Sequence, residues 1–223
     1  MVKTSILYYD SKEEQKGMRH MKIVCVGDSI TFGSGVRLTR SRNSYPSILA
    51  RFVGKKFKVY NLGNPGRTLS STGDFPYILE PEYRSSQELL ADIYIILLGT
   101  NDTKPYNWDE EVFKKEYPEF VRSYKRLINH PKVILMLPPK AFPVEWNDNE
   151  VAYDIQGDLL ENPVGTIIKD YAKEADLPLV DLYELTKKHP KWFVDGVHPN
   201  KKGNRAIAKE IYKCVIKNMK TPE

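Results

Sequence analysis

Short runs of apolar, often β-branched residues recur along the chain, and longer segments of helical character separate them. The apolar runs lie at 22–27, 57–61, 92–98, 132–137 and 178–182. Continuous apolar runs of this length are typical of strands buried on both faces. The helical segments lie at roughly 44–54, 83–91, 109–129, 161–175 and 201–219. This alternation predicts a single α/β domain with a parallel sheet.

In an open parallel sheet with right-handed crossovers, the segments that follow successive strands meet at one edge. Three such segments are rich in small and polar residues, and we expect a functional site where they meet. They read GDSITFG after the first strand, NLGNPGRT after the second and GTND after the third.

Ser29, in the first of these segments, is a candidate nucleophile. A serine hydroxyl needs a base to take its proton, so a suitable histidine must exist elsewhere. His198 is the best candidate, because Asp195 lies three residues before it and could orient its ring. Asn200 is expected to cap the helix that follows. The alternative is that this stretch, DGVHPN, forms only a turn and a helix cap.

The other histidines are weaker candidates for the base. His20 lies near the N-terminus, while His130 and His189 each precede a proline where a helix is expected to end. We therefore keep His198 in this role.

A nucleophilic mechanism also needs hydrogen-bond donors for an oxyanion. The backbone N–H of Gly66 and the side-chain amide of Asn101 are candidates, although turn geometry and an Asx turn are the alternatives for these residues. Asp28 and Asp102 are expected to brace the neighbouring loops through hydrogen bonds to backbone groups.

The four segments GDSITFG, Gly66 within NLGNPGRT, GTND and DGVH resemble, in order and spacing, the sequence blocks of the SGNH (GDSL-type) hydrolases. The resemblance implies a three-layer α/β/α flavodoxin-like fold and ester hydrolysis without a metal or other cofactor. It assigns Ser29 as nucleophile, His198 as base and Asp195 as the acid that orients the base. It also implies an oxyanion hole made by Ser29, Gly66 and Asn101. The predicted hydrolase domain spans 22–219, after an N-terminal extension at 1–21.

The charge pattern gives little indication of a polyanionic partner. The net charge is +5, and cations recur at every fourth residue of the last helix: Lys201, Arg205, Lys209, Lys213 and Lys217. Ile207, Ile211, Cys214 and Val215 form the opposite, apolar face. A solvated face of a docked helix is the preferred interpretation, and neither a nucleic acid nor a membrane is expected as a partner.

The cysteines, Cys25 and Cys214, are expected to be small buried side chains without a disulfide. Neither the cysteines nor the histidines have metal-ligand spacing, so no metal site is expected.

The loops that follow the strands suggest the substrate class. They mix aromatic residues with Asp, Asn, Ser and Lys, a composition that suits a carbohydrate better than a long acyl chain. Tyr106 and Trp192 are candidate stacking platforms, each also explained by packing. The residues predicted to contact the substrate are Asp28, Arg67, Trp108 and Trp146.

The predicted activity is therefore hydrolysis of short-chain esters, in particular O-acetyl groups on a small-molecule or oligosaccharide substrate. A lysophospholipase or thioesterase is the alternative enzyme, and a catalytically inactive carbohydrate-binding protein is the alternative from another class. The absence of a recognisable signal in the given sequence favours the cytoplasm, although a shortened form of an exported enzyme would look the same. The oligomeric state is not indicated.

Overall fold

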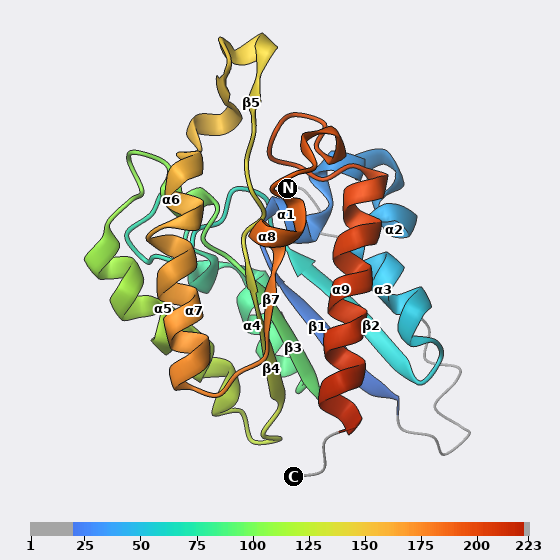
Figure 1. Cartoon of the computed structure of the whole chain (residues 1–223). Helices are drawn as coiled ribbons and strands as arrows, with labels where there is room; N and C mark the ends of the chain where they lie inside the picture. The colour runs from blue at the N-terminus through green and yellow to red at the C-terminus, as the bar shows by residue number, and fades with distance from the viewer. Residues whose placement is uncertain (1–19, 221–223) are drawn as a thin grey trace, which may run out of the picture.

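The computed structural model describes residues 20–220, except for the side chain of Lys220. Its centre is a five-stranded parallel sheet in the order β2-β1-β3-β4-β7 (Figure 1). The strands are β1 (Met21–Gly27), β2 (Phe57–Gly63), β3 (Ile93–Leu97), β4 (Lys132–Leu137) and β7 (Leu179–Asp181). This is the strand order of flavodoxin-like folds, so the predicted α/β fold is confirmed.

Helices cover both faces of the sheet, which explains the uninterrupted apolar runs of the strands. Within β1, Ile23 and Cys25 join one core cluster, while Val24 and Val26 join the other. Because successive side chains of a strand point to opposite faces, every position of a central strand must be apolar. The result is a three-layer α/β/α architecture.

The five long helices fall at the segments expected from the sequence. Helices α3 (Tyr45–Val53) and α9 (Lys201–Lys220) pack on the Ile23 face. Helices α4 (Pro81–Glu88), α5 (Glu110–Lys125) and α7 (Val164–Glu174) lie on the Val24 face. In Figure 1 the pair α3 and α9 is seen on the right of the sheet, and the pair α5 and α7 on the left.

Several short elements lie in the connections and were not predicted. The α-helical turns are α1 (Ser29–Phe32), α2 (Arg40–Asn43), α6 (Gly157–Glu161) and α8 (Leu182–Thr186). The 3-10 turns are η2 (Ser34–Thr39), η3 (Tyr77–Leu79), η4 (Asn101–Thr103), η5 (Glu145–Asn147), η6 (Ala152–Asp154) and η7 (Pro190–Trp192).

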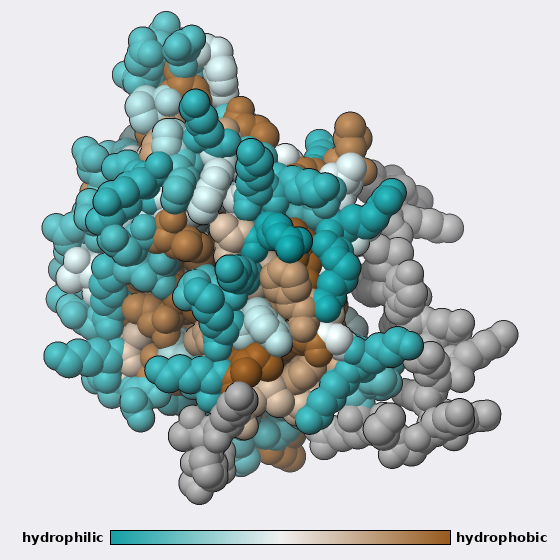
Figure 2. All heavy atoms as spheres, turned by 45° about the vertical axis from the view of Figure 1, so that its right-hand side comes forward, coloured by the Kyte–Doolittle hydropathy of each residue, from teal (hydrophilic) through white to brown (hydrophobic). Residues whose placement is uncertain are grey.

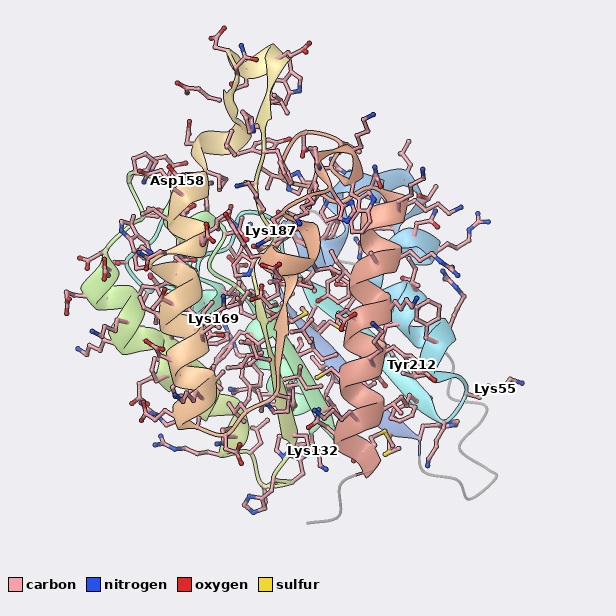
Figure 3. The ribbon with its side chains drawn as sticks, in the orientation of Figure 1. Lys55, Lys132, Asp158, Lys169, Lys187 and Tyr212 are labelled. Atoms are coloured by element: carbon pink, nitrogen blue, oxygen red, sulfur yellow. The ribbon has the colours of Figure 1, made fainter. Side chains whose placement is uncertain are left out.

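After β4 the chain leaves the sheet and forms a small antiparallel hairpin of β5 (Pro143–Val144) and β6 (Glu150–Val151). The hairpin projects from the top of the molecule in Figure 1, beyond the carboxyl ends of the sheet strands. Lys132, labelled in Figure 3 at the start of β4, marks the opposite edge of the sheet.

The predicted amphipathic character of α9 is confirmed. All five cations of its basic stripe are exposed, whereas Ile207, Ile211 and Val215 are fully buried. Figure 2 shows that this side of the molecule is mainly hydrophilic, with hydrophobic side chains visible in small patches. The basic stripe is therefore the outer face of a packed helix.

The two cysteines are free thiols, as expected. Cys25 is fully buried in β1, and burial raises the pKa of its thiol to about 12. Cys214 is only partly buried, so the expectation of two buried side chains is half correct.

Most of the expected N-terminal extension lies outside the described residues, and Met21 already pairs with Phe57 in the sheet. No helix between residues 20 and 220 has the length and apolar character that crossing a membrane requires.

Candidate active site

Ser29 occupies the first position of α1, directly after β1. Gly27 permits this sharp turn, because a Cβ at this position would lie 2.5 Å from the carbonyl oxygen of Leu97. The Asp28 side chain caps α1 by accepting a 2.8 Å hydrogen bond from the Ile30 N–H. The turn ends at Gly33, whose φ of 96° is in the left-handed region that favours glycine. The hydroxyl is therefore held where β1 ends.

A continuous chain of hydrogen bonds joins Ser29, His198 and Asp195. His198 Nε2 lies 2.8 Å from Ser29 Oγ, and Nδ1 lies 2.7 Å from Asp195 Oδ2. The other carboxylate oxygen, Oδ1, accepts bonds from the N–H groups of Val197 (3.1 Å) and His198 (2.7 Å). The three predicted triad residues therefore meet in one place, although 169 positions separate Ser29 from His198.

The carboxylate of Asp195 is kept ionised by this arrangement. Burial acts to raise its pKa, but the hydrogen bonds and the charge interaction with His198, together with the backbone donors, lower it to about 2. At neutral pH Asp195 therefore presents a negative charge to the imidazole.

The loop that carries His198 is fixed to two helices by asparagine side chains. Asn200 caps α9 by accepting bonds from the N–H groups of Lys202 and Gly203, as the sequence predicted. The fully buried Asn204 donates to the Pro199 carbonyl at 2.6 Å and accepts from the Tyr45 N–H at 2.8 Å. Asn204 thus joins this loop to the start of α3.

The predicted oxyanion donors lie beside the hydroxyl. Ser29, Gly66, Asn101 and His198 together line a pocket with a volume of about 200 Å³. Gly66 has a φ of 84°, in the left-handed region, which turns the chain after β2 toward this pocket. One hydrogen of the Asn101 amide is donated to the Arg67 carbonyl at 3.1 Å. The other hydrogen remains for a ligand, because a primary amide has two donors.

Two buried carboxylates brace the loops around the pocket, as expected. Asp102 accepts hydrogen bonds of 2.8–3.1 Å from the N–H groups of Leu69 and Ser70. Asp28 accepts from Ile30, and burial raises its pKa to about 6. Both side chains are fully buried, so their positions are set by the protein interior.

The residues predicted to contact the substrate do not line the pocket. Asp28 is buried beneath it, and Trp108 packs against Phe113 with a ring separation of 5.7 Å. Arg67 forms a 3.0 Å ion pair with Glu80, while Trp146 is 64% exposed on the hairpin. The loop composition suggested aromatic platforms for a substrate. It does not reveal that Trp108 packs against the core or that Arg67 forms an ion pair.

The remaining platform candidates and the alternative histidines also lie outside the pocket lining. Tyr106 is 61% exposed, and its ring lies 5.7 Å from the Lys104 ammonium group. His189 and Trp192 stack on one another with a ring separation of 3.8 Å. His20 bonds to the Lys55 carbonyl at 2.7 Å, and His130 lies in the turn after α5.

Sequence reasoning missed six of the ten residues that line the pocket. These residues are Ser34, Pro65, Lys104, Tyr153, Ile155 and Val197. Tyr153 donates a 2.9 Å hydrogen bond to Asp195, and the Lys104 ammonium lies 4.0 Å from Asp74. Pro65 and Val197 could have been found, because each adjoins a predicted site residue. No periodicity or motif marks Tyr153 and Ile155.

A second, larger hollow of about 390 Å³ shares no lining residue with the Ser29 pocket. It is formed by the segment from Lys188 to Trp192 and by Lys202, and its lysines are exposed. Its lining contains no serine, threonine or cysteine, so Ser29 remains the candidate nucleophile. Between residues 20 and 220, no group of three or more His, Cys, Asp or Glu side chains could hold a metal ion.

The strand order, the sharp turn at Ser29 and the hydrogen-bonded Ser–His–Asp chain are the arrangement expected of a serine hydrolase of the three-layer α/β class. Residues 25–206 match the GDSL-like lipase/acylhydrolase family, and the chain belongs to this family.

Relatives with named activities are also found. The chain is 31% identical over 216 residues to an acetylxylan esterase from Xylanibacter ruminicola. That alignment covers 88% of this chain but only 43% of the relative, so the chain spans less than half of that protein's length.

The fold is similar to those of several solved esterases. One is Est24, a carbohydrate acetylesterase from Sinorhizobium meliloti (TM-score 0.70, 20% identity, 89% of this chain and 99% of that chain). Another is an aryl esterase from M. smegmatis (TM-score 0.69, 22% identity, 88% of this chain and 99% of that chain). At these identities the similarity supports the fold.

Proposed function

We propose that this esterase removes O-acetyl groups from a carbohydrate through an acetyl-enzyme formed on Ser29. The observation on which this proposal depends is the hydrogen-bonded chain from Ser29 Oγ through His198 to Asp195, which opens into a pocket of about 200 Å³.

The first step is attack of Ser29 Oγ on the ester carbonyl, while His198 Nε2 takes the hydroxyl proton. Asp195 stabilises the imidazolium that forms and holds the ring in place. The carbonyl oxygen becomes an oxyanion, which receives hydrogen bonds from the N–H groups of Ser29 and Gly66 and from the Asn101 amide. When the intermediate collapses, the sugar leaves as an alcohol with the proton from His198.

The second step mirrors the first. Water attacks the acetyl-enzyme, His198 takes a proton from the water, and acetate leaves as Ser29 regains its proton. These steps use only groups of this chain and a water molecule.

Two observations support an acetyl group. The pocket is small, and its lining mixes polar side chains with the apolar residues Pro65, Ile155 and Val197. A long acyl chain would require an extended apolar groove, which this lining does not provide. The acetylxylan esterase similarity agrees with an acetylated polysaccharide as substrate.

The test is acetate release from acetylated xylo-oligosaccharides, combined with p-nitrophenyl acetate and octanoate as simple esters. We expect acetate release, and a higher kcat/KM for the acetate ester than for the octanoate. A preference for octanoate would contradict the acetyl specificity and favour the lysophospholipase or thioesterase alternative. Binding without hydrolysis would favour the inactive carbohydrate-binding alternative.

Ser29→Ala tests the nucleophile separately from the substrate. We expect a loss of about 10³-fold or more in kcat/KM, because the residual rate would come only from the oxyanion donors and binding. Ser71→Ala is the matched control, since that hydroxyl bonds to Glu116 at 2.7 Å outside the pocket. Hydrolysis that survives Ser29→Ala would refute the acetyl-enzyme.

A further inference from the structure

Tyr153, on the segment that follows the hairpin, contacts both partners of the proposed catalytic base. Its hydroxyl donates a 2.9 Å hydrogen bond to Asp195 Oδ2, the same oxygen that lies 2.7 Å from His198 Nδ1. Its ring stands edge-on to the His198 ring, with centroids 5.2 Å apart and planes inclined by 64°. One side chain therefore touches Asp195 through its polar end and His198 through its ring.

The backbone at Tyr153 is held in an unfavourable conformation to achieve this contact. Its φ of 64° and ψ of 28° lie in the left-handed region, and Asp154 follows with a φ of 58°. Residues with a Cβ adopt this region rarely and at an energetic cost. The surrounding structure must therefore impose it.

Contacts on both sides of Tyr153 supply that constraint. Before the hairpin, the Phe142 N–H donates to the Gly196 carbonyl at 2.9 Å, next to Asp195. After Tyr153, the Gln156 amide donates to the Thr103 carbonyl at 2.8 Å, and Ile155 is buried in a cluster with Val197. The segment is thus tied to the loop of His198 and to the loop of Asn101.

We propose that Tyr153 is a positioning residue for the Asp195–His198 pair, with its hydroxyl fixing the carboxylate that orients the imidazole. This inference rests on the proposed function, since the pair acts as the base there. The Tyr153 hydroxyl completes the hydrogen bonding of Asp195. The Oδ1 atom accepts bonds from two backbone N–H groups, and the Oδ2 atom accepts bonds from the His198 ring and the Tyr153 hydroxyl.

The hydroxyl is available as a donor at neutral pH. Burial, followed by the hydrogen bond and charge of Asp195, raises the pKa of Tyr153 above its usual value of 10. The other charged groups around the pair are Asp28, which interacts electrostatically with His198, and Lys104 in the pocket wall. Neither Asp28 nor Lys104 changes when Tyr153 is replaced.

Tyr153→Phe removes the hydroxyl and keeps the ring against His198. Without this donor, no hydroxyl of Tyr153 stabilises the negative charge of Asp195. Asp195 therefore attracts the protonated imidazole more strongly. The acidic limb of the pH profile of kcat/KM should then move to higher pH, by about half a pH unit or more. The plateau value of kcat should fall by about tenfold, because a hydrogen bond to a charged group is lost at the base.

The experiment compares kcat and kcat/KM for p-nitrophenyl acetate across pH 5–9 in wild type, Tyr153→Phe and Tyr212→Phe. Tyr212 is the matched control, because it packs edge-on to Phe52 at 5.8 Å on α9, away from the pocket. Figure 3 shows it on the side of α9 next to α3. We expect the shifted acidic limb only in Tyr153→Phe, with a melting temperature close to that of wild type.

The outcomes separate the two proposals. If Tyr153→Phe keeps the wild-type profile and kcat while Ser29→Ala is inactive, Tyr153 has no positioning role and the nucleophile assignment stands. If kcat falls but the limb does not move, Tyr153 acts only through packing and the inference is wrong. If Ser29→Ala remains active, the proposed function itself fails.

Discussion

Two aspartates on opposite sides of the pocket have pKa values shifted in opposite directions. Asp28, beside Ser29, is fully buried, and burial raises its pKa to about 6. Asp195, beside His198, is partly buried, yet its hydrogen bonds lower its pKa to about 2. The nucleophile side, named after Ser29 as the proposed nucleophile, belongs to the sheet core, whereas the base side, named after His198 as the proposed base, is a loop.

The comparison shows two ways of fixing a reactive group. On the nucleophile side, strand ends and buried carboxylates determine where Ser29 and Asn101 lie. On the base side, no strand leads directly into His198, so hydrogen bonds from Asn204, Tyr153 and backbone groups replace the sheet. We expect substitutions of the buried carboxylates on the first side to affect mainly stability, and substitutions on the second side to affect mainly activity.

The largest expected effect is on the base side. Asp195→Asn should lower kcat by about 10⁴-fold, because an amide would favour the wrong tautomer of the imidazole. The fold should persist, as judged by circular dichroism and thermal melting. Asp154→Asn is the matched control, since Asp154 is exposed and Asn tolerates its left-handed backbone. Equal losses in both variants would contradict the triad assignment.

The next effect is on the nucleophile side. Asp102→Ala leaves the buried N–H groups of Leu69 and Ser70 without an acceptor, which should lower the free energy of unfolding by about 2–5 kcal/mol. Urea unfolding measures this change. Asp109→Ala removes an exposed helix cap at the start of α5 and should cost only about 1 kcal/mol. Similar losses in the two variants would show that burial of Asp102 does not increase its contribution to the free energy of unfolding.

The third effect concerns the pH dependence of stability. The pKa of Asp28 is about 6 in the folded protein and 3.8 in the reference state, so its stabilising contribution is complete below pH 3.8. This contribution is lost as the pH rises through 6, because the carboxyl must then ionise while buried. Asp28→Asn cannot ionise. Relative to wild type, its free energy of unfolding should rise by about 2 kcal/mol between pH 4 and pH 8.

Urea unfolding of wild type and Asp28→Asn at the two pH values checks this expectation. Using the difference between the two proteins removes the contribution of other titrating groups. A difference that does not change with pH would mean that Asp28 ionises as easily in the folded chain as in the unfolded one.

The sequence was sufficient for the sheet and for the residues that meet at its edge. Strands buried on both faces leave long apolar runs, and the first three of these runs end in small or polar residues at the same edge of the sheet. This is why the positions of Ser29, Gly66 and Asn101 could be predicted together. His198 could be predicted because its orienting acid lies only three residues away.

The segment 138–156 could not be predicted, for physical reasons. Each strand of its hairpin has two residues, too few for an alternating pattern to emerge. The left-handed backbone at Tyr153 depends on tertiary contacts, and tyrosine gives no local indication of such a conformation. Likewise, the sequence does not reveal that Trp108 packs against Phe113 while Trp146 is 64% exposed on the hairpin.

The buried amide of Asn204 joins three parts of the molecule: the loop of His198, the first turn of α9 and the start of α3. Separation of these two helices would therefore break hydrogen bonds that hold the loop of His198, the proposed general base. Thermal inactivation of the enzyme and detachment of its C-terminal helix should consequently be one cooperative event rather than two.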